Sequence, residues 1–136
     1  MKVLIDSSTL YSAIAHDSKV SNIIELLIEE HTIVLSDYIV EELERNLRKN
    51  VSKEKEDKVI DLIEDFVSNC QVIKKDDYIK NLQRAEKMIS KKDAPILACG
   101  MLPDIDYIVT SDKEFFEIEI DDVSILSPNE IDDILL

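Results

Sequence analysis

Two aspartates follow apolar segments that have the composition of buried strands. The first segment, KVLI, runs directly into Asp6, and the second, DYIVTS, runs into Asp112. A carboxylate at the end of a strand either caps the helix that follows or faces a functional site. The choice depends on whether other acidic residues come to the same place.

Three further carboxylates could reach that place. Asp93 opens the apolar segment DAPILACGML, and Glu41 and Glu42 lie early in the helical segment DYIVEELERNLRK. Acidic groups that converge without basic partners repel one another, and their pKa values rise unless a cation lies between them. Oxygen ligands without Cys or His favour Mg²⁺ or Mn²⁺ over zinc, and such sites hydrolyse phosphodiesters. We therefore expect a site for Mg²⁺ or Mn²⁺.

Each of these residues also has a purely structural interpretation. Asp6, Asp93 and Asp112 could be helix N-caps, and either glutamate could favour its helix through the helix dipole. Hydroxyl residues beside the aspartates could simply form turns: Ser7, Ser8, Thr110 and Ser111. Caps and metal ligands do not exclude each other, and the coincidence of so many acids on one edge favours a site.

Other acidic residues are predicted to be exposed. Asp106 lies at the start of the strand that Asp112 follows, about 13 Å away and therefore at the opposite edge of the sheet. A second group has no apolar residues around it and is expected to form a solvated acidic face: Asp121, Asp122, Asp132 and Asp133.

The elements that position these residues alternate between strands and helices. We predict strands at 2–5, 32–36, 70–74, 107–110 and 123–126, and helices at 7–15, 21–30 with Ser21 as its N-cap, 37–49, from Ser52 to about 67, 78–89, 93–102 and 127–135. The strands are continuous apolar runs, which is typical of a parallel sheet covered on both faces. The single glycine argues against a fold built on tight hairpins. We predict one α/β domain over residues 1–136, a three-layer α/β/α sandwich with a central, mainly parallel sheet of about five strands.

The net charge of −14 is unevenly distributed. Residues 1–44 hold nine acids and two bases, residues 104–136 hold eleven acids and one base, and residues 45–103 hold ten acids and thirteen bases. The basic middle could be a phosphate-facing surface or a set of solvated helix faces, and both interpretations stay open. The charge total therefore does not exclude a nucleic-acid partner.

Cysteine and histidine do not form a recognisable site. Cys70 and Cys99 lack metal-ligand spacing and are predicted to be small buried hydrophobes, while His16 and His31 stand alone, so zinc is not expected. No stretch approaches the roughly 18–20 apolar residues of a membrane span, and no signal peptide precedes the first strand. We expect a cytoplasmic protein without a membrane partner.

Four segments, taken in order, resemble the PIN-domain family. VLIDSSTL resembles its opening strand and first catalytic aspartate, SDYIVEEL the exit of its second strand, KKDAPILACGM its third acid, and DYIVTSDKEF its fourth. The resemblance covers almost the whole chain. It implies a Mg²⁺- or Mn²⁺-dependent ribonuclease with four catalytic carboxylates: Asp6, Glu42, Asp93 and Asp112. Of these, Asp6, Asp93 and Asp112 would bind the metal.

The resemblance also implies supporting residues. Ser8 stands where the family often has a polar residue, Thr110 matches a hydroxyl residue before the fourth acid, and Glu114 stands where a further acid often follows. We choose Glu42 as the family's glutamate because an apolar residue follows it directly, although Glu41 remains open. The chain departs from the family at Asp-Ser-Ser, where Asp-Thr-Asn is common.

Three functions follow as hypotheses. The first is an endoribonuclease acting on RNA, including the toxin of a toxin–antitoxin pair with an antitoxin protein as partner. The alternative is a PIN-like protein-binding module with little or no nuclease activity. A phosphohydrolase or phospho-acceptor domain is a poorer match, because Ser8 stands where an acid is needed. Apolar residues on an early helix could serve a core or a homodimer: Ile23, Ile24, Leu27 and Ile28.

Overall fold

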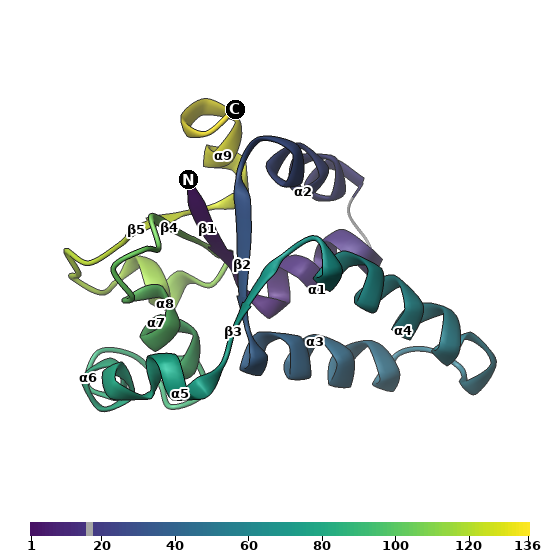
Figure 1. Cartoon of the computed structure of the whole chain (residues 1–136), viewed down its shortest axis with the longest axis horizontal. Coiled ribbons are helices and arrows are strands. Elements are labelled where there is room, and N and C mark those ends of the chain that lie inside the picture. The colour runs from purple at the N-terminus through teal and green to yellow at the C-terminus, as the bar shows by residue number, and fades with distance from the viewer. Residues whose placement is uncertain (16–17) are drawn as a thin grey trace.

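The strands form one parallel sheet in this computed structural model, which describes residues 1–15 and 18–136. The sheet has five strands in the order β3-β2-β1-β4-β5, and all four neighbouring pairs are parallel (Figure 1). The strands are β1 (Lys2–Ile5), β2 (Thr32–Ser36), β3 (Gln71–Ile73), β4 (Tyr107–Val109) and β5 (Ser124–Leu126). All five lie within a residue or two of their predicted positions. His16 lies outside the described residues.

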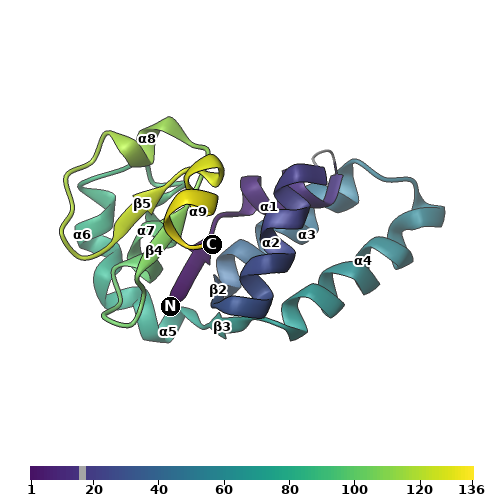
Figure 2. The same ribbon diagram turned by 90° about the horizontal axis from the view of Figure 1, so that it is seen from above.

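Helices cover both sides of this sheet. Helices α1 to α4 lie on one side of the strands and α5 to α8 on the other, as Figures 1 and 2 show. Their bounds are α1 (Ser7–Ala15), α2 (Ser18–Glu30), α3 (Asp37–Lys49), α4 (Lys53–Ser68), α5 (Lys75–Tyr78), α6 (Leu82–Glu86), α7 (Ala94–Gly100), α8 (Lys113–Phe116) and α9 (Pro128–Ile134), with a 3₁₀ helix η1 (Ile79–Asn81). The predicted α/β/α sandwich is confirmed.

The central strands are apolar because both of their faces are covered. Val3, Leu4 and Ile5 of β1 are fully buried, as are the three central residues of β2. From β1, the chain adds β2 and then β3 toward one edge of the sheet. It then returns to the centre and adds β4 and β5 on the opposite flank of β1, toward the other edge. In open parallel sheets, this change of direction leaves a crevice at the carboxyl ends of the strands. That crevice lies between the ends of β1 and β4.

The single glycine allows α7 to lie very close to the sheet. A Cβ atom added to Gly100 would lie 2.3 Å from Cδ1 and 2.7 Å from Cγ1 of Ile108, in β4. A side chain there would displace the helix or the strand, since real Cβ contacts are not that short. Gly100 therefore fixes how closely α7, and the loop that precedes it, approach the strand ends.

Two helical predictions need correction. The helix predicted at 21–30 begins at Ser18, so Ser21 lies inside α2 and is not its N-cap, because Val20 extends the apolar stripe backwards. The helix predicted over 78–89 is divided into α5, η1 and α6. Hydrogen bonds to residues distant in the sequence stabilise this divided arrangement. Asp37 accepts from the Lys75 backbone and the Tyr78 hydroxyl, and Asn81 Nδ2 donates to the Ala98 carbonyl.

Several other side chains lie where they were predicted. Asp106 is exposed at the opposite edge, where it accepts from the Lys2 backbone at 2.9 Å. The acidic face at 121–122 and 132–133 is exposed. Cys99 is buried, Cys70 is half-buried, and burial raises the pKa of each thiol to about 12. No helix in the described ranges is both long and apolar enough to cross a membrane.

The apolar residues of α2 belong mainly to the core. Ile23, Ile24 and Leu27 are at most 6% exposed within a single chain, so their burial needs no second copy. Ile28 is only partly buried and borders a surface pocket instead. The homodimer stays a prediction that these buried residues do not support.

Candidate active site

Asp6 lies at the end of β1, almost fully buried at 3% exposure. Its Oδ1 accepts from the Thr9 backbone at 2.9 Å, so it caps α1. Its Oδ2 accepts from the hydroxyls of Ser8, at 3.2 Å, and Thr110. The cap interpretation is therefore correct for Asp6, and its second oxygen links the start of α1, through Ser8, to the end of β4, through Thr110.

Glu42 is the buried member of the glutamate pair in α3. It is 8% exposed and its Oε1 accepts from the Ser7 hydroxyl at 3.0 Å, whereas Glu41 is exposed. The helix begins after Ser36, whose hydroxyl accepts from the Ile39 backbone at 3.1 Å. The burial and the bond to Ser7 favour Glu42 over Glu41 as the site residue.

Asp93 occupies the N-cap position of α7 without capping it. No backbone N–H of α7 donates to its side chain, which instead accepts from the Ser90 hydroxyl at 3.2 Å. Pro95 follows in the first turn and fixes the helical start. The Asp93 carboxylate is therefore free of the helix and faces the crevice, at only 9% exposure. The cap interpretation fails for this residue.

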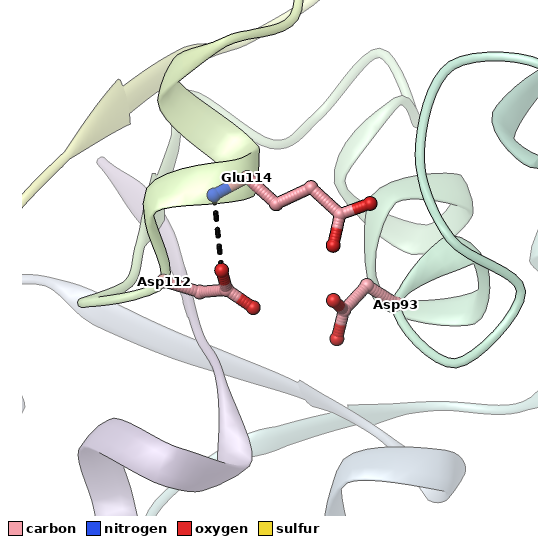
Figure 3. Close-up of side chains that lie close together, drawn as sticks. All are labelled: Asp93, Asp112 and Glu114. Carbon is pink, nitrogen blue, oxygen red and sulfur yellow. Dashed lines mark hydrogen bonds between the residues drawn. The ribbon is translucent and has the colours of Figure 1, made fainter.

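Asp112 and Glu114 come from the short turn that follows β4. Asp112 caps α8, since its Oδ1 accepts from the Glu114 backbone at 3.0 Å. Glu114 reaches across the crevice to Ser90, where its carboxylate accepts from the backbone at 2.7 Å and from the hydroxyl at 3.2 Å. Figure 3 shows the side chains of Asp93, Asp112 and Glu114 converging on one space.

These three carboxylates form a tight group. One oxygen from each of Asp93, Asp112 and Glu114 lies within 4.8 Å of the others, which is a spacing suited to a shared metal ion. None of the ion pairs in the described part of the chain involves the group. The pKa of Asp93 rises to about 6, chiefly through burial, then through the charge of Asp112, with Glu114 adding to it. This repulsion is the one expected of carboxylates that converge without a basic partner.

Two residues link the group to the other acids. The Thr110 hydroxyl donates to Asp6 and accepts from the Asp112 backbone at 3.0 Å, joining the ends of β1 and β4. Tyr38 donates its hydroxyl to the carbonyl of Lys92, the residue before Asp93, and the pKa of its phenol is raised by burial and then by the charges of Glu42 and Asp93. Asp6 and Glu42 thus adjoin the tight group without belonging to it.

The tight group overlaps the predicted metal set without matching it. Asp6, Asp93 and Asp112 are the predicted ligands, whereas the tight group contains Asp93, Asp112 and Glu114. The predicted set stays a prediction. Sequence reasoning missed Ser90 and Tyr38 altogether. Ser90 stands three residues before Asp93, a spacing that indicates a local side-chain bond, but its link to Glu114 spans 24 residues and leaves no local signal.

The family follows from a domain match. A family model of the PIN domain matches residues 2–114, most of the chain, and the chain therefore belongs to the PIN-domain family. A search of curated protein sequences found no match.

Solved structures of similar fold support the same architecture. VapBC2 from Rickettsia felis, bound to a DNA fragment from their promoter, matches with a TM-score of 0.70 and 23% identity over 93% of this chain and 98% of the other. FitAcB from Neisseria gonorrhoeae matches with a TM-score of 0.75 and 17% identity over 93% and 97%. DNA-bound VapBC from Salmonella typhimurium matches with a TM-score of 0.65 and 16% identity over 94% and 98%. At these identities the likeness shows the fold.

Proposed function

We propose that this protein is a Mg²⁺- or Mn²⁺-dependent endoribonuclease that cleaves RNA phosphodiester bonds. The observation that carries the proposal is the group of Asp93, Asp112 and Glu114, three converging carboxylates without a cationic side chain among them. PIN-family membership adds support, since the predicted carboxylates Asp6 and Glu42 lie beside this group at the same edge.

The donor set fits a hard divalent cation. All three side chains offer carboxylate oxygens, with no Cys or His among them, which favours Mg²⁺ or Mn²⁺ over zinc. A bound ion of this kind orients and acidifies water and offsets the charge that develops on a phosphate. The raised pKa of Asp93 fits the same picture, because a cation between the carboxylates would relieve their repulsion.

The protein's own residues would hold this arrangement in place. Thr110 ties Asp6 to the backbone of Asp112, and Ser90 orients Asp93 and Glu114 from the opposite wall. Glu42 would bind a water or complete the ligand set from the α3 side. Each carboxylate is thus oriented by hydroxyl or backbone donors, which is the support that a metal ligand needs.

We propose further that the protein is the toxin of a toxin–antitoxin pair. The similar folds of VapBC2 and FitAcB support this assignment. So does a pocket of about 370 Å³ between α1, α2 and α4, whose apolar lining includes Ile14, Ile28 and the 58% exposed Leu62. An antitoxin segment with apolar side chains would cover this surface.

The test is a calorimetric titration of Mn²⁺ into the metal-free protein and into Asp93→Asn and Asp112→Asn variants, followed by cleavage of a single-stranded RNA. We expect Mn²⁺ binding and metal-dependent cleavage in the wild type, and loss of both in the two variants. Asp106→Asn is the matched control, because it removes the same charge at the opposite edge and should leave both unchanged.

One specific outcome would favour the second candidate, a PIN-like protein-binding module. If the wild type binds no Mn²⁺, or if both variants bind it as well as the wild type does, the nuclease assignment falls. The pocket between α1, α2 and α4 would then be the main candidate for a functional surface, because its lining is largely apolar and includes the exposed Leu62. Mn²⁺ binding without RNA cleavage would point the same way.

A further inference from the structure

A second pocket opens beside the carboxylates, between α3, α5 and α7. Its volume is about 370 Å³, and its apolar walls come from Tyr38, Tyr78, Leu82 and Pro95. Tyr78 is the most buried of these four residues, at 2% exposure. Flat aromatic and apolar walls of this kind suit a planar ring, because nucleobases stack on aromatic side chains regardless of sequence.

This pocket shares a wall with the acidic site. The Tyr38 hydroxyl donates to the carbonyl of Lys92 at 2.8 Å, and Lys92 directly precedes Asp93. The ring of Tyr38 therefore lines the pocket while its hydroxyl lies near the carboxylates of Glu42 and Asp93. A nucleotide whose phosphate lay over the carboxylates would have its base within reach of the pocket.

The two acids that line the pocket differ in how they are used. Asp37 is fully engaged, since its oxygens accept from the backbones of Tyr38 and Lys75 and from the Tyr78 hydroxyl at 2.6 Å. Glu41 is exposed, and no hydrogen bond or ion pair to it exists within residues 1–15 and 18–136. Its carboxylate is the acceptor in the pocket that remains available to a ligand.

A basic segment of the chain contributes to the same pocket, because Lys75 is one of its lining residues. Residues 74–92 carry seven basic and three acidic residues in a chain whose net charge is −14. The seven basic residues are all exposed: Lys74, Lys75, Lys80, Arg84, Lys87, Lys91 and Lys92. Arg84 is paired with Asp122, which leaves the lysines to face solvent. Exposed lysines on this segment suit the phosphates of a single strand, and they include Lys75 of the pocket lining and Lys92, which directly precedes Asp93.

We propose that the pocket between α3, α5 and α7 is a nucleobase subsite that binds guanine next to the scissile phosphate. This inference rests on the proposed ribonuclease function and names a base preference for the same site. The ring stacks against Tyr38 and Pro95, and the Glu41 carboxylate accepts from N1–H and N2–H. Among the four RNA bases, only guanine presents two adjacent donors on its Watson–Crick edge, the edge that proteins contact in single strands.

The test uses nucleosides, which carry no phosphate, and metal-free protein, so that neither catalysis nor metal binding contributes. Guanosine, adenosine and uridine are titrated separately while NMR records the ring signals of the two tyrosines and the Leu82 methyl groups. We expect guanosine to bind on the order of tenfold more tightly than the others, since a bidentate carboxylate contact supplies that discrimination. Glu41→Gln should remove the preference while retaining weak stacking.

Glu64→Gln is the matched control, because it removes one exposed glutamate charge from α4, away from the pocket. It should leave the guanosine preference unchanged. Absence of ring shifts with every nucleoside, or equal affinity for all three, would overturn the inference. A Mn²⁺ titration tests the proposed function separately. If the protein binds Mn²⁺ but no nucleoside, only the guanine subsite is rejected. If it binds guanosine but no Mn²⁺, only the metal-dependent nuclease function is rejected.

Discussion

The Thr110 hydroxyl serves two carboxylate segments at once. It donates to Asp6 Oδ2 and accepts from the Asp112 backbone, and the side chain is fully buried. A hydroxyl group can do both, whereas the methyl group of valine can do neither. This one oxygen atom therefore adds a side-chain link to the backbone pairing that already joins β1 and β4.

The Thr110→Val variant should lose about 1–3 kcal/mol of unfolding free energy at neutral pH, because a buried carboxylate and a backbone N–H each lose a partner. Urea unfolding followed by circular dichroism measures the change. Thr9→Val is the matched control: the Thr9 hydroxyl oxygen is buried and has no hydrogen-bond partner among the residues that the structure describes, so its removal should be neutral or stabilising. Equal losses in the two variants would mean that the Thr110 bonds contribute nothing.

Asp93 should destabilise the metal-free protein at neutral pH. Its pKa is about 6 in the folded chain and lies near 3.8 in the unfolded chain, so the folded state binds the proton more tightly. The stability contributed by this proton is complete below about pH 4 and is lost as the pH rises through about 6. In the absence of metal, Asp93→Asn should be more stable than the wild type by roughly 1–2 kcal/mol at pH 8.

This difference should disappear below about pH 4, where Asp93 is protonated in both states. Asp133→Asn removes an exposed carboxylate and should show neither the gain nor its pH dependence. Chemical unfolding in EDTA across this pH range provides the measurement. A gain that stayed constant with pH would show that the carboxylate charge is not its cause.

Single residues differ in how well the sequence predicted them. Asp6 and Asp112 were predictable because each directly follows an apolar strand, and the parallel sheet brings those strand ends together. The position of the Glu114 carboxylate was not predictable, because it depends on a short helix and on hydrogen bonds donated by Ser90 from across the crevice. Side-chain length and long-range bonds leave no periodic trace in a sequence.

Helix α7 carries Asp93 at its start, and its position against the sheet is set by close packing at its other end. Gly100→Ala should destabilise the protein by about 1–3 kcal/mol, because the new methyl group would overlap the side chain of Ile108. Thermal unfolding measures the loss. Weakened Mn²⁺ affinity should accompany it, since a shift of α7 moves Asp93 relative to Asp112.

A double variant separates overlap from general damage. Ile108→Val removes Cδ1, the atom that the added methyl group would meet at 2.3 Å, and alone should cost about 0.5–1.5 kcal/mol. The double variant, Gly100→Ala with Ile108→Val, should therefore lose less unfolding free energy than the sum of the losses in the two single variants. Strict additivity would show that the overlap is relieved elsewhere.

Elements were predictable where one apolar pattern dominates. The five strands and the long helices α3 and α4 follow continuous or periodic apolar residues, and they lie close to their predicted positions. The segment from α5 to α6 was predicted as one helix, because Tyr78, Ala85 and Ile89 share helical spacing and are indeed buried. The break between them comes from bonds to Asp37 and Ala98, partners that are distant in the sequence.

The whole molecule carries a net charge of −14, so salt of any kind should raise its stability by screening repulsion. MgCl₂ should raise the melting temperature more than NaCl of the same ionic strength does. Mg²⁺ binding to the folded state adds roughly 1.4 kcal/mol to the free energy of unfolding when the free Mg²⁺ concentration is about ten times the dissociation constant. Differential scanning fluorimetry compares the two salts. Asp112→Asn should respond equally to both, and an equal response in the wild type would contradict a specific site.

The change of direction in the sheet divides the carboxylates between two parts of the chain. Asp6 and Glu42 precede β3, and Asp93, Asp112 and Glu114 follow it. A polypeptide whose synthesis stops after β3, or that a protease cuts before α5, therefore yields no fragment with the full set. Two separately expressed halves would regain the set only by reassociating, and the β1–β4 pairing is one contact through which they would do so.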